Sequence, residues 1–147
     1  MKIAIGADHA GYYAKEEIKT VIKALGHTVE DLGTSSETSV DYPDFAEKVA
    51  RMVASGVADK GVLICGTGIG MSMAANKVAG IRAALITDEK TAALSRQHND
   101  ANVFCAGART TPVVRIAESL KVWLQTPFEA GRHVNRVSKI MAIEKKC

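Results

Sequence analysis

The sequence predicts a three-layer α/β/α sandwich built around a five-stranded parallel, Rossmann-like sheet. Five short apolar runs recur along the chain, and amphipathic stretches of helical length separate them. A strand that is apolar throughout is buried on both faces, which is typical of a parallel sheet with helices on either side. A chain of 147 residues fits one domain, and we expect residues 1–147 to form it.

The predicted elements follow one another in order, strand and helix in turn. Gly26 ends the first helix, and Pro43 suits the first turn of the second, where its missing N–H needs no partner. Asp88 caps the fourth helix. The expected strands are residues 3–5, 27–32, 61–65, 81–86 and 102–106, and the expected helices are residues 12–25, 43–55, from the turn at 66–70 to about 77, 88–97, 112–124 and 131–143.

Composition excludes several classes of function. A net charge of +3 and an aromatic content of 5% are too low to indicate nucleic-acid binding. No apolar run reaches the roughly 18 residues of a membrane span. The chain reaches Asp8 and His9 too early for a signal peptide, so we expect a cytoplasmic protein.

The three cysteines indicate neither a disulfide framework nor a zinc site, because their number is odd and no C-x-x-C occurs. Cys105 lies inside an apolar run and is expected to be a small core residue. Cys147 is terminal. Cys65 differs, because it ends the third predicted strand, and ligands of parallel sheets bind beyond the carboxyl ends of the strands.

A glycine-rich loop follows Cys65, with the sequence Gly66-Thr67-Gly68-Ile69-Gly70-Met71-Ser72. Its backbone N–H groups and the start of the next helix favour an anion, either a phosphate or the oxyanion of an enediolate. The same field would stabilise a thiolate on Cys65. The alternative is a tight turn beside an inert, buried cysteine.

A dinucleotide site is a second interpretation of this loop. The G-x-G-x-x-G pattern fails at Met71, although Asp88 stands twenty residues after Gly68, the spacing of a ribose-binding acid. A P-loop is excluded because no Gly-Lys-Ser/Thr follows.

Other polar groups are expected near a ligand. Asp8 and His9 follow the first strand, although Asp8 could simply cap the next helix. Arg132 and Arg136 share a helix face, and Arg109 adds a third group of the kind that binds phosphate in a bidentate manner. With the thiol and the anion-binding loop, this set suits proton transfer next to the carbonyl of a small phosphorylated substrate.

These residues resemble the type B ribose-5-phosphate isomerases, a family that also includes galactose-6-phosphate and allose-6-phosphate isomerases. The resemblance covers nearly the whole chain. Its motifs are Gly6-Ala7-Asp8-His9-Ala10-Gly11, Asp41-Tyr42-Pro43, Cys65-Gly66-Thr67-Gly68-Ile69-Gly70, Ala74-Ala75-Asn76-Lys77, Gly80-Ile81-Arg82-Ala83, Ser95-Arg96-Gln97-His98-Asn99-Asp100-Ala101-Asn102 and Gly131-Arg132-His133.

The resemblance implies a role for each candidate residue. Cys65 matches the base that moves a proton between C1 and C2 through an enediolate, and His98, with Asp8 nearby, matches the group that opens the furanose ring. Asn99 matches a contact to a substrate hydroxyl. The anion hole corresponds to Gly66, Thr67, Gly68, Ile69, Gly70 and Ser72, and the phosphate site to His9, Arg109, Arg132 and Arg136.

The resemblance also implies a homodimer, or a dimer of dimers, whose active sites cross the subunit interface. His98 and Asn99 would come from the partner chain, and the helix over 131–143 would pack on it. No metal or organic cofactor is implied. The expected reaction interconverts ribose 5-phosphate and ribulose 5-phosphate in the non-oxidative pentose phosphate pathway, with a six-carbon sugar phosphate as the alternative substrate. A non-catalytic nucleotide- or phosphate-binding module is a more distant alternative.

Overall fold

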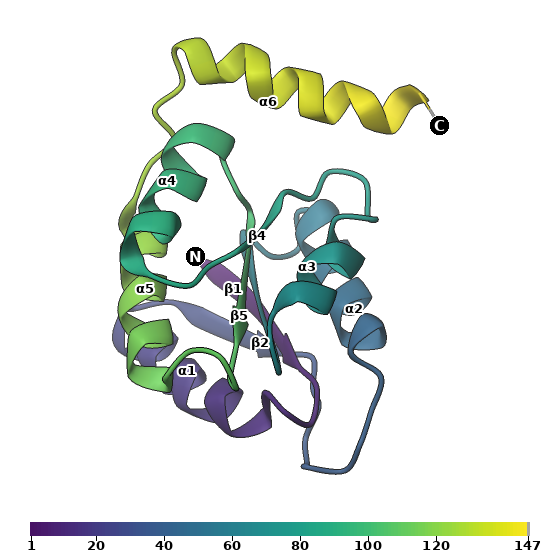
Figure 1. Ribbon diagram of the computed structural model, residues 1–147, viewed down its shortest axis with the longest axis vertical. Coiled ribbons are helices and arrows are strands. Elements are labelled where there is room, and N and C mark those ends of the chain that lie inside the picture. The colour runs from purple at the N-terminus through teal and green to yellow at the C-terminus, as the bar shows by residue number, and fades with distance from the viewer. Residues whose placement is uncertain (147) are drawn as a thin grey trace.

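The computed structural model describes residues 1–146 and contains one sheet of five parallel strands in the order β2-β1-β3-β5-β4 (Figure 1). Neighbouring strands pair in parallel along the whole sheet. The predicted fold class is therefore confirmed. The strands are β1 (Lys2–Ala7), β2 (Thr28–Asp31), β3 (Lys60–Cys65), β4 (Ala83–Leu85) and β5 (Val103–Gly107).

Helices cover both faces of the sheet (Figure 1). One core cluster lies between the sheet and the layer of α1, α4 and α5, and the second lies under α2 and α3. The helices are α1 (Tyr12–Ala24), α2 (Tyr42–Ala54), α3 (Ile69–Ala75), α4 (Glu89–Asn99), α5 (Val113–Gln125) and α6 (Arg132–Ile143), and a 3₁₀ turn follows over Glu144–Lys146.

The continuous apolar strands divide their side chains between the two cores. In β1, Ile3 and Ile5 belong to the α1 and α5 side, whereas Ala4 between them belongs to the α2 and α3 side. In β3, Ile64 and Cys65 divide in the same way. Burial on both faces explains why these strands show no polar alternation.

The edge strand β4 is shorter than the predicted strand over 81–86. Two asparagine side chains take the backbone donors at its start: Asn102 Oδ1 accepts from Arg82 N–H at 2.8 Å, and Asn76 Oδ1 accepts from Ala83 N–H at 2.8 Å. These bonds satisfy the backbone without a strand partner, so regular pairing begins only at Ala83.

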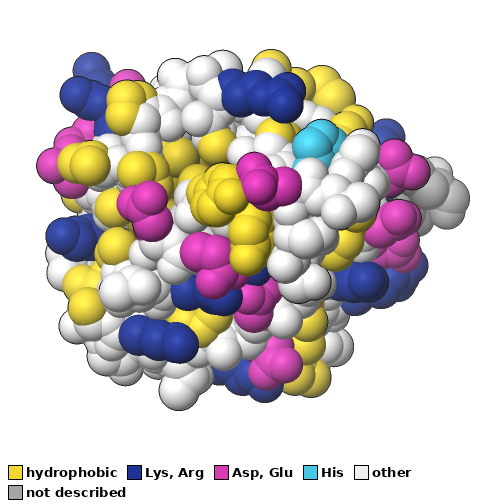
Figure 2. Space-filling model, turned by 90° about the horizontal axis from the view of Figure 1, so that it is seen from below, with side chains coloured by type: hydrophobic (Ala, Val, Ile, Leu, Met, Phe, Trp, Pro, Cys, Tyr) yellow, Lys and Arg dark blue, Asp and Glu magenta, His cyan; other side chains and the backbone are white. Residues whose placement is uncertain are grey.

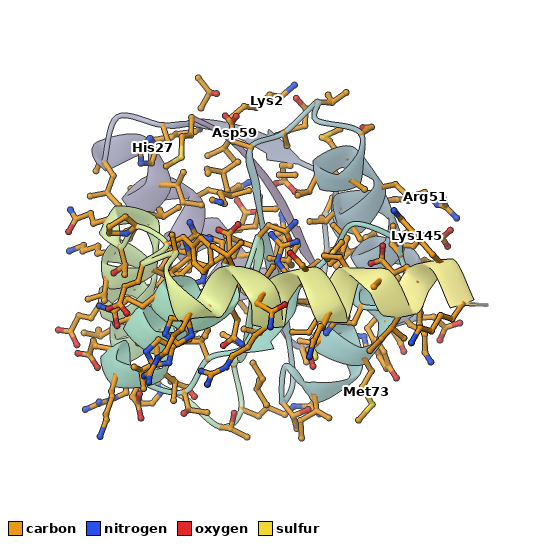
Figure 3. The ribbon with its side chains drawn as sticks, turned by 90° about the horizontal axis from the view of Figure 1, so that it is seen from above. Lys2, His27, Arg51, Asp59, Met73 and Lys145 are labelled. Carbon is orange, nitrogen blue, oxygen red and sulfur yellow. The ribbon has the colours of Figure 1, made fainter. Side chains whose placement is uncertain are left out.

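The two ends of the sheet carry different elements. The carboxyl ends of β1, β3 and β5 meet at one edge, where Cys65 lies opposite Gly107. Helix α4 runs back along the sheet and ends at Asn99, shortly before β5 begins, so its last turn lies at the opposite edge. Helix α6 crosses above that amino edge (Figures 1 and 3).

Helix α6 contacts its own chain sparingly. His133 is its one buried residue, and Met141 Sδ lies 3.2 Å from Arg82 Nη1. The apolar residues Val134 and Ile140 are 47% and 43% exposed. Within residues 1–146, no helix combines the length and the apolar character that a bilayer crossing requires.

A buried lysine joins α1 to β2. Lys15 is 1% exposed, and its Nζ donates to Asp31 Oδ2 at 2.6 Å and to Glu16 Oε1 at 2.9 Å. Burial alone would raise the pKa of the Asp31 carboxyl, but hydrogen bonds from Lys15, Lys19 and Gly33 N–H outweigh it and lower that pKa. The carboxylate form of Asp31 is therefore favoured in the folded state.

We predict that Asp31→Asn lowers the free energy of unfolding at pH 7 by about 1–3 kcal/mol, because Lys15 loses a charged acceptor. Since folding lowers the Asp31 pKa, this contribution is present above the ordinary carboxyl pKa of 3.8 and disappears as the pH falls through the folded value. Urea denaturation between pH 3 and 8 measures both effects.

The control is Glu30→Gln, on the same strand, which removes an exposed pair with Lys2 at 3.2 Å. Exposed pairs contribute less than about 1 kcal/mol. Equal losses in the two variants would contradict a special role for the buried lysine.

Candidate functional site

Cys65 is the last residue of β3, and its thiol lies at the start of the glycine loop. Gly68 N–H donates to Cys65 Sγ at 3.1 Å, and the residue is 4% exposed. A backbone donor suits a thiolate, since hydrogen bonds to charged acceptors are the stronger ones. Cys105 is fully buried, and burial, followed by the effect of Cys65, raises the pKa of its thiol. The core role predicted for Cys105 is thus confirmed, whereas Cys147 lies outside the described residues.

Gly68 allows this geometry because of its backbone and its surroundings. Its φ is +77°, and a Cβ at this position would lie 2.6 Å from Leu85 Cδ1 and 2.8 Å from the carbonyl carbon of Ala106. The space against β5 is therefore closed to any side chain.

The loop uses part of its own hydrogen-bonding capacity. Thr67 Oγ1 accepts from Ile69 N–H at 3.2 Å, which leaves the threonine proton available to donate. Ser72 Oγ donates to Ile69 O at 2.7 Å, and Ser72 N–H donates to Gly68 O at 3.1 Å. Hydrogen bonds inside the loop and α3 therefore engage the N–H groups of Gly68, Ile69 and Ser72. The predicted anion hole has fewer free backbone donors than the sequence suggests.

Arg109 lies over the glycine loop. The turn after β5 is held to β3, since Ala108 N–H donates to Cys65 O at 2.8 Å and Arg109 N–H donates to Gly66 O at 2.9 Å. A Cβ on Gly66 would lie 3.4 Å from Arg109 Nη1. The exposed guanidinium is therefore within reach of an anion bound by the loop.

Asp8 and His9 line the same edge from β1. Asp8 Oδ1 accepts from Ala10 N–H and Gly11 N–H, both at 3.0 Å, so one carboxylate oxygen orders the turn that precedes α1. His9 Nδ1 accepts from Val40 N–H at 3.2 Å. With Nδ1 as an acceptor, Nε2 is the ring nitrogen that can donate a hydrogen bond.

Tyr42 is a further residue of this edge that the sequence did not single out. An added Cβ on Gly70 would lie 2.5 Å from Tyr42 Cζ and 2.7 Å from its hydroxyl oxygen, so the phenol covers Gly70. Its place in the Asp41-Tyr42-Pro43 motif was the available signal. Figure 2, viewed from the side opposite α6, shows exposed side chains of both charges, and a histidine, around apolar ones on this face.

The remaining predicted residues lie together at the other edge. His98 and His133 stack with ring centroids 4.3 Å apart, and Arg132 and Arg136 are exposed on the first turns of α6. Burial lowers the pKa of His133, and the charges of His98, Arg132 and Arg136 lower it further. Asn99 ends α4, beside His98.

The two groups cannot meet within one chain. One group follows the carboxyl ends of the strands and the other lies beyond their amino ends, and the four residue steps of β5 alone span about 13 Å. We call them the thiol half-site (Asp8, His9, Cys65, the loop 66–72 and Arg109) and the histidine half-site (His98, Asn99, Arg132 and Arg136).

A cavity of about 720 Å³ lies beneath α6 and is separate from the thiol half-site. Its walls include Ile81 and Ala83 from the sheet edge and Ile140 from α6, and Asn99 is its one residue from the histidine half-site. This cavity therefore belongs to the contact between α6 and the body of the molecule.

Asp88 serves the fold. Its Oδ1 accepts from Thr91 N–H at 2.7 Å, and the Thr91 hydroxyl completes a capping box at the start of α4. Asp88 is therefore a helix cap, which argues against its role as the ribose-binding acid of a dinucleotide site.

Comparison with known proteins assigns the fold to a family. The family model described as Ribose/Galactose Isomerase matches residues 3–140. The chain belongs to this family. Ribose-5-phosphate isomerase B of Escherichia coli K12 is 47% identical over 145 residues, which cover 99% of this chain and 97% of that protein.

Solved structures agree with the family assignment. Ribose-5-phosphate isomerase B of Clostridium thermocellum superposes with a TM-score of 0.98 at 51% identity, and the match covers 99% of both chains. The enzyme of the same name from Mycoplasma genitalium, solved with bound ribulose 5-phosphate, has a TM-score of 0.95 at 44% identity, and the match covers 99% of this chain and 97% of that one.

We predict that Gly68→Ala lowers the free energy of unfolding by clearly more than the roughly 1–2 kcal/mol that a positive φ costs an alanine, because the added methyl group also collides with β5. Gly56→Ala is the matched control: its φ is +75°, and a Cβ there meets nothing within 4 Å. The control should cost about 1–2 kcal/mol. Equal losses of unfolding free energy in urea would show that the loop is not packed as described.

Proposed function

We propose that this protein is an aldose–ketose isomerase that interconverts ribose 5-phosphate and ribulose 5-phosphate through an enediolate, with Cys65 as the base. The observation that carries the proposal is the thiol held by Gly68 N–H at 3.1 Å, at the edge where Asp8, His9 and Arg109 gather. The relatives named ribose-5-phosphate isomerase B support the choice of a pentose phosphate.

In the proposed reaction, the Cys65 thiolate removes the proton from C2 of the open-chain aldose and the carbonyl oxygen at C1 becomes anionic. Transfer of the C2 hydroxyl proton to the oxygen at C1 and return of the carbon-bound proton to C1 give the ketose, with its carbonyl at C2, so atoms and electrons balance within one substrate molecule. The Thr67 hydroxyl and the remaining N–H donors of the loop would stabilise the oxyanion. Because the step only moves protons, it requires no redox cofactor or metal, and we propose none.

Ring opening and phosphate binding are assigned to the two half-sites jointly. His98, with Asp8, would move the protons that open the furanose, and Asn99 would bind a hydroxyl group. The Nε2–H of His9 and the guanidiniums of Arg109, Arg132 and Arg136 would bind the phosphate. Arginine suits this task because its planar fork binds two phosphate oxygens at once.

A homodimer would unite the half-sites. A two-fold axis pairs the thiol half-site of one chain with the histidine half-site of its partner, and symmetry then completes two sites. The exposed apolar side chains of α6 support a partner contact at this helix: Val134 is 47% exposed, and Ile140, at the cavity beneath the helix, is 43% exposed. Two such dimers could associate further. A cytoplasmic location suits the free thiols of Cys65 and Cys105.

We predict that Cys65→Ala lowers kcat by at least about 10²–10⁴-fold, the usual contribution of a general base, and leaves the circular dichroism spectrum unchanged. Cys105→Ala is the matched control; it should keep kcat and lose some stability through a small cavity. The assay uses ribose, allose and galactose phosphates.

A near-normal kcat in Cys65→Ala would contradict the assignment of Cys65 as the base. Preference for a six-carbon sugar phosphate would reassign the substrate. Tight nucleotide binding without turnover of any sugar would favour a non-catalytic module.

The shared site predicts complementation between two inactive variants. Cys65→Ala and His98→Ala homodimers each lack one group in both sites, whereas a mixed dimer contains one intact site. Random exchange makes half of the dimers mixed, each with half of its sites intact, so activity should recover to about a quarter of the wild-type value.

Native mass spectrometry verifies the exchange, and a mixture of Cys65→Ala with Cys65→Ser is the control that should stay inactive. Exchange without recovery would mean that each chain contains its own complete site.

A further inference from the structure

Among residues 1–146, the side chains of His98, Glu129 and His133 form the one group whose ligand atoms could hold a metal ion. These atoms all lie within 4.8 Å of one another. Glu129 Oε2 lies 4.0 Å from His98 Nε2 and 3.8 Å from His133 Nε2. From this geometry we propose that the three residues bind a divalent transition-metal ion, and that the bound ion inhibits the enzyme.

The backbone positions the three residues relative to one another. Glu129 N–H donates to Gln97 O at 3.1 Å, so the segment before α6 is fastened to the last turn of α4, next to His98. His133 N–H donates to Ala130 O at 3.0 Å, across a turn in which Ala130 has a φ of +57°. The backbone of Glu129 is therefore fixed next to α4, and its carboxylate lies within 4.0 Å of the Nε2 atoms of both rings.

The distances are close to those of a coordinated ion. Bonds of about 2.1 Å to a tetrahedral ion place two ligand atoms about 3.4 Å apart, so atoms that are now up to 4.8 Å apart must move closer. His133 is the fixed member, with a side chain 6% exposed, whereas His98 and Glu129 are 39% and 50% exposed and can adjust. The stacked rings, inclined at 15°, would have to splay slightly.

The donor set selects the class of ion. Two imidazoles and one carboxylate are the ligands of zinc sites that keep an open position, and they also suit nickel and copper. Magnesium and calcium require more oxygen ligands. Arg132 and Arg136 act on His133 through their charge and oppose a cation, so binding depends on the metal–nitrogen bonds rather than on simple charge attraction.

Inhibition follows from the position of His98. In the function proposed above, on which this consequence rests, His98 moves a proton during ring opening. A metal ion bound to Nε2 would occupy the lone pair that accepts this proton. The ion would thus block the first step while leaving the thiol half-site intact.

The test measures Zn²⁺ binding to the purified full-length protein by isothermal titration calorimetry, in a buffer without chelators. Glu129→Gln and His133→Gln each remove one ligand, and Glu129→Gln changes an exposed side chain that should not affect folding. His27→Gln is the matched control, because His27 is a histidine well away from α6 (Figure 3). All variants keep the cysteines, so thiol binding would be equal in each.

We expect one Zn²⁺ per chain in the wild type and in His27→Gln, and at least about tenfold weaker binding in both ligand variants. Zn²⁺ should inhibit the wild type, and Glu129→Gln should keep its metal-free rate and resist inhibition by a similar factor. No binding, or equal binding in all four proteins, overturns the site. Equal inhibition of all four overturns the inhibitory role. Binding as expected in a protein without isomerase activity would refute the proposed function and uphold the site.

Discussion

The direction of the strands is the constraint on which the rest of the molecule depends. In a parallel sheet every strand ends at the same edge, and each helix must return to the other edge before the next strand begins. Cys65 and Arg109 therefore lie at one edge, and the end of α4 with His98 lies at the other. No side-chain movement within one chain removes a separation of about 13 Å or more, so chemistry that needs both groups requires a second chain.

Position, and not residue type, separates the two described cysteines. Both side chains belong to the core on the α2 and α3 side. Cys105 lies in the middle of β5, is fully enclosed, and has a raised pKa. Cys65 is one residue from the glycine loop and receives a backbone hydrogen bond from Gly68. The end of the strand supplies a donor that the interior cannot, because interior N–H groups are used in the sheet.

Much of this arrangement could be predicted from the sequence. Periodicity and glycine signals placed every strand and helix within two residues, because these signals are local. Tertiary contacts could not be predicted in the same way. Asn76 and Asn102 shorten β4, and Tyr42 covers Gly70 although the two are far apart in the sequence. The Ser72 hydroxyl donates to Ile69 O within α3. Glu129 was missed as well, since only the folded chain brings its carboxylate close to both histidines.

The start of α6 is poorly arranged for stability alone. Arg132 and Arg136 lie within its first two turns, where the helix dipole is positive, and acidic residues are absent from the first turn. The pair also lies beside His133, whose pKa it helps to lower. Cations at a helix N-terminus repel both the dipole and one another, and an anion held between them would relieve both effects. The unfavourable charge pattern thus supports a phosphate at this helix, and the exposed apolar side chains of the same helix support the subunit contact. Assembly of the dimer and completion of the site would then depend on one element.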